Sequence, residues 1–231
     1  MIVLLTAWLA LGLVSAVTGG AVLSLVGWPE QLKHREERFF VSVWVGLFTC
    51  ASIVLGVASI VPLRSWYLAT PLLLLAARSV RATLHQLMLT WSEFLVIGLI
   101  ATGMSRLASG SGTLYDSSLY HSQLVRWMSD YGLPPGLGLL HYRFGFSSSW
   151  LALTALFDQG SLSYRMLNSV TGFAIVLLLA QFAFALTRKG ERKDRGPDLY
   201  LITAIHFSYL PAGSSWCKRH RQISVWERHS C

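Results

Sequence analysis

The chain has 231 residues, of which 53% are hydrophobic and only 13% are charged, and its apolar residues fall in long runs. A soluble domain carries about 25% charged residues, so this composition excludes an ordinary soluble fold and predicts an integral membrane protein. The net charge of +8 does not indicate nucleic-acid binding, because the basic residues form short blocks beside apolar runs. The lipid bilayer, and no nucleic acid, is therefore the expected partner.

The first apolar run, Ile2 to Val26, has no charged residue and exceeds the about 20 residues that cross a bilayer. It lacks a preceding basic segment and is longer than the apolar part of a typical signal peptide. We therefore predict a retained transmembrane helix in preference to a cleaved leader. The connector from Glu30 to Arg38 carries three basic residues, which favour the cytoplasm and place the N-terminus on the extracytoplasmic side.

Three further spans are predicted within residues 1–107. The run from Phe39 to Val61 is uncharged, whereas the run from Trp66 to Ala77 has only 12 residues, so a tilted or re-entrant segment remains its alternative. The run from Trp91 to Leu107 carries one charge, Glu93, near its start, where snorkelling or a helix N-terminal role is expected. Four crossings place the following segment outside the cytoplasm.

A polar interval, residues 108–165, is predicted to be an extracytoplasmic loop. Apolar side chains recur at helical spacing from Tyr120 to Tyr131, and Gly132 follows. This pattern predicts an amphipathic helix of about 15 residues that begins at Asp116, with its apolar side on the bundle or the membrane surface. The stretch SSWLALTALF, residues 148–157, is too short to span and predicts an interfacial or re-entrant helix.

The last clear apolar run, Met166 to Leu186, is uncharged, and five basic residues follow it within eight positions, from Arg188 to Arg195. These basic residues are the strongest topological signal in the chain. They predict a transmembrane helix over residues 166–187 that ends in the cytoplasm. The fold class expected from all these runs is an all-α, polytopic membrane helix bundle with an extracytoplasmic loop that contains an amphipathic helix.

The character of the sequence changes after Pro197, and residues 188–231 are expected to form a basic, disordered or aberrant cytoplasmic tail. A membrane bundle does not usually close in this way, so we expect the chain to be the N-terminal part of a larger protein. The tail holds four cysteine and histidine residues that could bind zinc on paper, but their spacing matches no standard ligand pattern: Cys217, His220, His229 and Cys231.

Asp116 is the leading candidate for a catalytic carboxylate. An aspartate at the start of a predicted helix is also a good N-cap, and a carboxylate fixed there and facing water is well placed to take a proton. His121 lies five residues further on, about 140° around a helix, so the two side chains do not share a face. A direct pair between Asp116 and His121 is therefore not expected.

Five further side chains of the interval are candidate substrate contacts: Tyr120, His121, Arg126, His141 and Arg143. Arginine binds phosphate through planar, charge-assisted hydrogen bonds, with lipid-headgroup contact as the alternative for Arg126. For His121, the alternative to a substrate contact is interfacial packing. Asp130 lies near the end of the predicted helix, where the dipole disfavours a negative charge, so Arg126 is its expected partner.

An aspartate, a Tyr-His pair and an amphipathic helix ending in Gly-x-Pro follow one another in YDSSLYHSQLVRWMSDYGLPPGLGLLHYRFGFSSSWLALTALF. This order resembles the first catalytic loop of GT-C type glycosyltransferases, and the interval is similar to that of large bacterial multi-pass membrane proteins of this kind. The resemblance covers about Trp91 to Leu186.

The resemblance implies that a sugar is transferred from a polyprenyl-phosphate donor on the extracytoplasmic side of the cell membrane. It implies Asp116 as the base and His121 as a contact to the donor phosphate or the acceptor. In such enzymes the loop carboxylate can instead help to hold a divalent metal. No paired acidic motif is present here, so no metal ligand is expected and a divalent metal cofactor is left open. A full enzyme of this type has further helices after Arg195. A non-catalytic membrane scaffold remains the alternative, and a transporter half is disfavoured because the spans lack central charges and no repeat is present.

Overall fold

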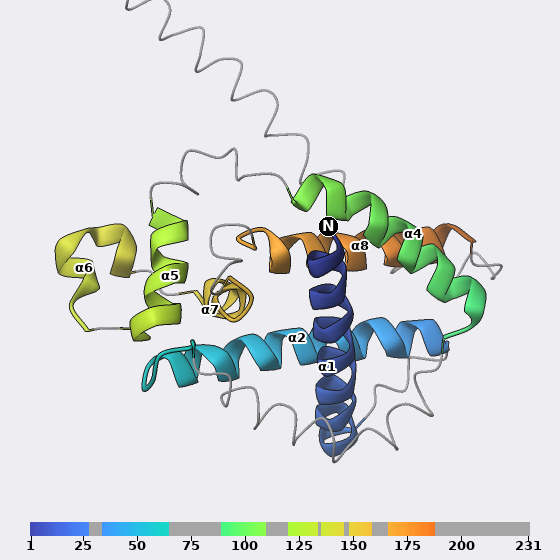
Figure 1. Cartoon of the computed structure of the whole chain (residues 1–231). Coiled ribbons are helices and arrows are strands. Elements are labelled where there is room, and N and C mark those ends of the chain that lie inside the picture. Colours follow the sequence, from blue (N-terminus) through green and yellow to red (C-terminus); the bar gives the residue numbers. More distant parts are fainter. Residues whose placement is uncertain are drawn as a thin grey trace, which may run out of the picture. The chain divides into compact units, whose positions relative to one another are not determined.

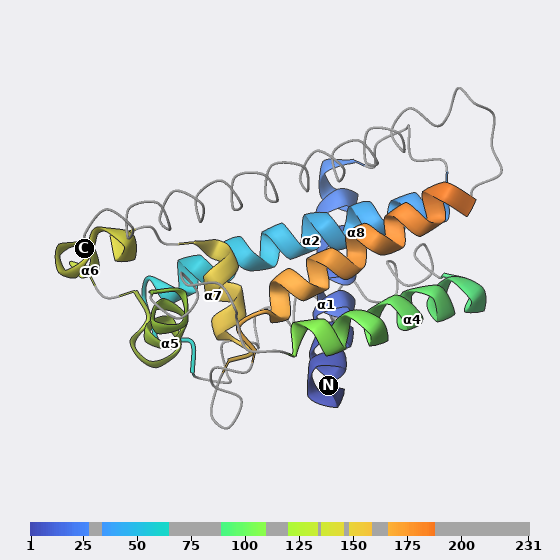
Figure 2. The same cartoon turned by 90° about the horizontal axis from the view of Figure 1, so that it is seen from above.

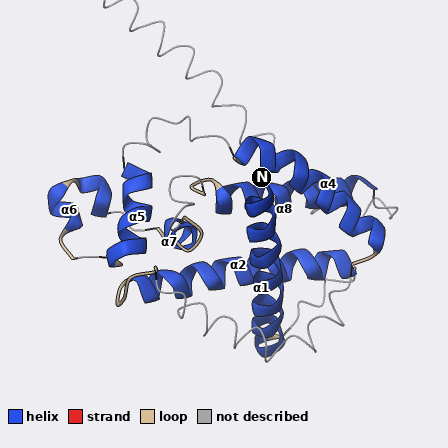
Figure 3. Cartoon of the chain, in the orientation of Figure 1, coloured by secondary structure: helices blue, strands red, loops and turns tan. Residues whose placement is uncertain are grey.

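The structure, a computed structural model, describes seven stretches of the chain: residues 1–27, 34–64, 89–109, 120–133, 135–145, 148–158 and 166–187. Within these stretches every regular element is a helix, which confirms the predicted all-α fold (Figure 1; Figure 3). Three predicted features lie outside the described residues, namely the span from Trp66 to Ala77, the candidate base Asp116 and the tail 188–231.

Three helices are long and apolar enough to cross a membrane, by length and composition. They are α1 (Ile2–Val26), α2 (Arg35–Ala58) and α8 (Ser169–Thr187). At about 1.5 Å per residue, the 25 residues of α1 extend about 37 Å, which exceeds the roughly 30 Å hydrocarbon core of a bilayer. The chain thus has the helices of a multi-pass membrane protein, as its composition predicts.

The second span begins and ends earlier than its apolar run predicts. We expected a helix from Phe39, but Arg35–Arg38 already form the first turn of α2. The backbone N–H of His34 donates to the carboxylate of Glu37 at 3.4 Å, and a carboxylate at this position also complements the helix dipole. The helix ends at Ala58, and the N–H groups of Ile60 and Val61 both turn back to the carbonyl of Val57.

The fourth predicted span forms a helix, α4 (Trp91–Ala108), but this helix, with 18 residues and a charge in each terminal turn, is not among the three that are apolar enough to cross a membrane. At its start, the hydroxyl of Thr90 accepts from the N–H of Glu93, while the carboxylate of Glu93 accepts from the N–H of Thr90. This reciprocal pair is a capping box. It confirms the helix N-terminal role expected for Glu93, and Arg106 in the last turn suits the opposite end of the dipole.

Helices α1 and α2 cross where both carry small residues. Gly19 lies so close to the Ser42 carbonyl, and Gly46 to the Ser15 carbonyl, that an added Cβ would overlap either oxygen. The hydroxyl of Ser42 donates to the carbonyl of Ala16 across the same contact. Lipid tails offer no hydrophobic drive between helices, so close backbone packing of this kind stabilises the pair.

The chain divides into two compact units, residues 1–177 and 178–231. In the first unit, the start of α8 packs on the N-terminal part of α1, and the indole N–H of Trp8 donates to the carbonyl of Ser169 at 2.7 Å. A Cβ on Gly172 would lie 2.6 Å from the Trp8 ring and 3.0 Å from the Cβ of Ala108 at the end of α4. Of the second unit, the described part is the C-terminal part of α8.

We predict that Gly46→Ala destabilises the bundle by about 1–3 kcal/mol, because its methyl group would meet the Ser15 carbonyl. Gly56→Ala, in the same helix, is the matched control, since nothing lies within 4 Å of a Cβ there. We expect it to be neutral or to stabilise by up to about 1 kcal/mol, because alanine favours helix. Thermal unfolding in detergent micelles measures both, and equal midpoints for the two variants would contradict the contact.

Candidate functional site

The polar interval contains the predicted amphipathic helix, α5 (Ser122–Tyr131), while its predicted start at Asp116 lies outside the described residues. Tyr120 and His121 precede it in a wider helical turn. The apolar face of α5 is buried through Leu124, Val125 and Met128, and α5 packs on α7 (Ser149–Ala155). Helix α7 is the short helix predicted for residues 148–157, so both helices of the interval form as expected.

Backbone hydrogen bonds fasten α5 to the end of α2. The N–H groups of Leu63 and Arg64 donate to the carbonyls of Met128 and Ser129 at 3.1 and 2.8 Å. In the opposite direction, the N–H of Leu133 donates to the carbonyl of Ala58 at 2.7 Å. The views in Figures 1 and 2 both show α5 beside this end of α2. The end of α2 therefore holds the amphipathic helix directly. We call this contact between residues 58–64 and 128–133 the seat of α5.

Gly132 makes this seat possible. Its φ of 79° is the left-handed conformation that glycine adopts at low cost, and it ends α5. A Cβ at this position would lie only 2.6 Å from the carbonyl oxygen of Ala58. A side chain would consequently push the end of α5 away from α2.

Two arginines flank Asp130 near the end of α5. Asp130 lies 3.5 Å from Nε of Arg126, the partner expected four residues earlier, and 3.6 Å from Nη1 of Arg64. The Arg126 and Arg64 side chains are 54% and 71% exposed, so both guanidinium groups face solvent or lipid headgroups. Arg64 was not among the predicted residues, because only the seat on α2 brings residue 64 to residue 130.

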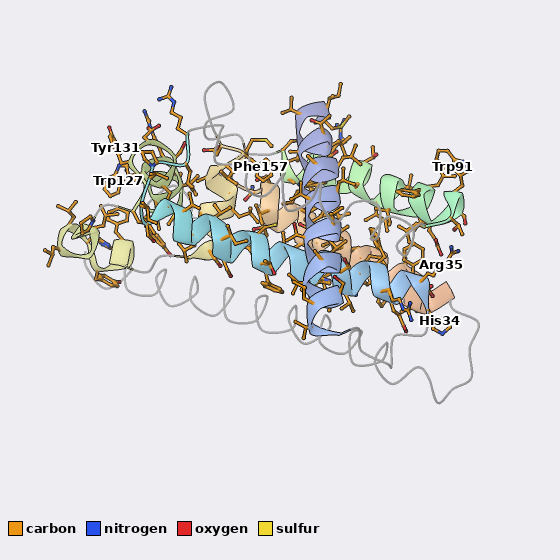
Figure 4. All side chains as sticks on the ribbon, turned by 90° about the horizontal axis from the view of Figure 1, so that it is seen from below. His34, Arg35, Trp91, Trp127, Tyr131 and Phe157 are labelled. Carbon is orange, nitrogen blue, oxygen red and sulfur yellow. The ribbon has the colours of Figure 1, made fainter. Side chains whose placement is uncertain are left out.

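An aromatic cluster, Trp127, His141, Tyr142 and Phe144, joins α5 to the segment that follows it. That segment comprises α6 (Leu137–Leu140) and the short helix η3 (Tyr142–Gly145). The ring of Phe144 lies 5.0 Å from Trp127 and 5.7 Å from His141, and His141 stacks on Tyr142 at 4.9 Å. Figure 4 shows Trp127 and Tyr131 projecting from α5.

The predicted substrate contacts thus lie at different places along α5 and the α6–η3 segment. Tyr120 and His121 lie edge to face at the start of α5, with ring centres 4.3 Å apart. Arg126 is near the other end of the helix, beside Asp130, and His141 belongs to the aromatic cluster. The backbone of Arg143 lies in η3, while its side chain and Asp116 are outside what the structure describes.

Asp158 is a buried acidic residue that sequence reasoning did not single out. It is 2% exposed, and its carboxylate accepts from the N–H of Met166 at 3.0 Å. The bond closes the connection between α7 and α8, and the indole N–H of Trp150 donates to the hydroxyl of Thr171 at 3.1 Å across the same junction. The only sequence signal for Asp158 is its position directly after an apolar run.

Among the described residues, no group of three or more His, Cys, Asp or Glu side chains could hold a metal ion.

The family model described as "Domain of unknown function (DUF8201)" matches residues 1–215, which is most of the chain. The chain belongs to the DUF8201 family. No curated protein and no solved structure matches it. The matched range includes every helix described above, so α5 and its seat on α2 lie within the DUF8201 domain.

For this DUF8201 chain we predict that Gly132→Ala loosens α5 from α2, whereas Gly136→Ala does not. Both glycines have positive φ, 79° and 90°, so alanine is strained at either position. The backbone cost is about 1–2 kcal/mol at Gly136, which is left-handed with ψ 1°, and about 1–3 kcal/mol at Gly132, whose ψ of −143° is rarely adopted by other residues. Only Gly132 approaches a carbonyl of α2, since the nearest atom to a Cβ on Gly136 is a Leu139 methyl at 3.8 Å.

Hydrogen exchange at the amides of Leu63 and Arg64 measures the difference. We expect faster exchange in Gly132→Ala and native protection in Gly136→Ala. Unchanged protection in both variants would show that the end of α5 does not depend on this close approach.

Proposed function

We propose that the protein is a membrane glycosyltransferase, or the N-terminal part of one, that uses a polyprenyl-phosphate sugar on the extracytoplasmic side. The observation that carries the proposal is the seat of α5, which holds Arg64 and Arg126 where α2 ends. The phosphate of a lipid-linked donor lies at the membrane surface, so cationic groups at the end of a span are well placed to bind it. The resemblance of the interval to GT-C catalytic loops supports the same function.

The reaction requires two kinds of group. The acceptor hydroxyl oxygen forms a bond to the sugar C1 while the bond from C1 to the phosphate oxygen breaks, and the electron pair leaves with the polyprenyl phosphate. A base must take the hydroxyl proton, the role we assign to Asp116. Cationic donors must stabilise the departing phosphate, the role we assign to Arg126 with Arg64.

Two contacts support the proposed order of crossings, in which the start of α1, the end of α4 and the start of α8 share one side of the membrane. The basic connector before α2, and not these contacts, assigns that side to the exterior. Trp8, Ala108 and Gly172 come from these three places and pack together. The end of α2 and the polar interval are also both outside in this orientation, and they share the backbone hydrogen bonds of the α5 seat.

A non-catalytic membrane scaffold is the second candidate. The specific observation in its favour is that ion pairing with Asp130 accounts for Arg126, and stacking in the aromatic cluster accounts for His141, without any substrate.

We expect Asp116→Asn to lower transfer from a polyprenyl-phosphate sugar by about 10²-fold or more, because general bases typically contribute 10²–10⁴-fold. Asp130→Asn is the matched control: it removes one carboxylate from the same interval, and exposed ion pairs such as Asp130 makes contribute at most about 1 kcal/mol. We expect it to keep most of the turnover. Equal turnover by wild type and Asp116→Asn would remove Asp116 from the mechanism, and no transfer by wild type would favour the scaffold.

Cysteine labelling tests the orientation separately from the chemistry. In a chain whose native cysteines are replaced, Gln123→Cys lies on the exposed side of α5 and Arg35→Cys at the exposed start of α2. We expect an impermeant maleimide to label position 123 in intact cells and position 35 only after permeabilisation. The reverse pattern would place α5 in the cytoplasm and contradict transfer on the outer side.

A further inference from the structure

The α6–η3 hairpin, residues 136–145, exposes apolar side chains that contact little of the described chain. Leu139 and Leu140 are 93% and 73% exposed, and Tyr142 is 65% exposed. The two arms meet at glycines, since a Cβ on Gly138 would lie 3.4 Å from the Cα of Gly145. The hairpin therefore closes on itself without covering its own leucines.

The position of the hairpin relative to a membrane span follows from contacts already described. The ring contact of Phe144 with Trp127 joins the hairpin to α5, and the seat joins α5 to the end of α2. Helix α2 has 24 residues and extends about 36 Å, enough for one crossing, so its last turn near Ala58 lies at the boundary of the hydrocarbon core. The hairpin is thus held close to the level at which the chain leaves the bilayer.

The side chains of the hairpin and of the residues around it are of the kinds found at the membrane interface. Tyrosine and tryptophan are enriched at membrane interfaces, where a ring contacts both apolar and polar groups, and the aromatic cluster supplies such rings. The exposed arginines at positions 64 and 126, on the same framework, complement the phosphates of lipid headgroups. Lipid can cover Leu139 and Leu140, whereas water would leave both exposed.

We propose that the α6–η3 hairpin is a membrane-interface anchor. Leu139 and Leu140 enter the acyl-chain region of the leaflet on the side of α5, and the aromatic cluster lies at the level of the headgroups. Through Trp127 the anchor acts on the C-terminal half of α5, the half that the seat also joins to α2. It does not depend on transferase activity, because a scaffold with the same framework would use it equally.

Spin labelling tests the anchor in the full chain reconstituted in phosphatidylcholine and phosphatidylglycerol vesicles, with the native cysteines replaced. A nitroxide is attached to Leu139→Cys and, as matched control, to Gln123→Cys, which is also exposed but polar. Oxygen concentrates in the acyl region and a nickel chelate in water, so the ratio of their collision rates reports depth. We expect the ratio to be severalfold higher at position 139 than at position 123.

A second label at Leu140→Cys keeps the result independent of one substitution, and we expect it to behave like position 139. Collision with the nickel chelate equal to that at position 123 would place the leucines in water and overturn the anchor. Protection from both reagents would also overturn it, because protein, as a second copy or another part of the chain, would then cover the hairpin.

Discussion

The arrangement of the polar interval depends on one contact, the direct approach of two backbones at the end of α2. Residues 58–64 and 128–133 exchange three hydrogen bonds there, and Gly132 has no side chain to separate them. Ala58, Leu63 and Met128 are buried, so bonds between the two segments satisfy backbone groups that would otherwise be costly to leave unpaired. The seat therefore fixes both the position and the rotation of α5, and with them the side chains on its exposed face.

The crossing of α1 and α2 obeys the same constraint inside the membrane. Gly19 and Gly46 bring the two backbones together, and the Ser42 hydroxyl donates across the contact to Ala16. Where lipid surrounds the helices, apolar side chains gain little by leaving it, and close packing decides which helices associate. Small residues thus hold the bundle together both within the membrane and at its edge.

The sequence predicts those features that depend on neighbours along the chain. Long apolar runs predict α1, α4 and α8 within a few residues, and the spacing of Arg126 and Asp130 predicts their ion pair. Helix periodicity also predicts α5 and α7, although a charged first turn moved the start of α2 to Arg35.

Other features depend on residues that are distant in sequence, and no local pattern encodes them. Arg64 reaches Asp130, the ring of Phe144 contacts Trp127, and Asp158 accepts from Met166 only after the helices have packed. The i, i+4 rule that finds Arg126 has no counterpart for Arg64, which is 66 positions from Asp130. For this reason the sequence finds one arginine of the site and misses the other.

The ion pairs at Asp130 bear on how a phosphate would bind in the proposed transferase. Both arginines are more than half exposed, and exposed ion pairs contribute only about 0–1 kcal/mol to stability. The phosphodiester of a lipid-linked sugar carries one negative charge on two free oxygens, as a carboxylate does, so it can replace Asp130 as the partner of either guanidinium at small cost to the fold. A fully buried pair would resist this exchange, because separating it leaves a charge without water or partner. In the proposed transferase, the exposure of both arginine side chains would let them turn from Asp130 to the donor phosphate.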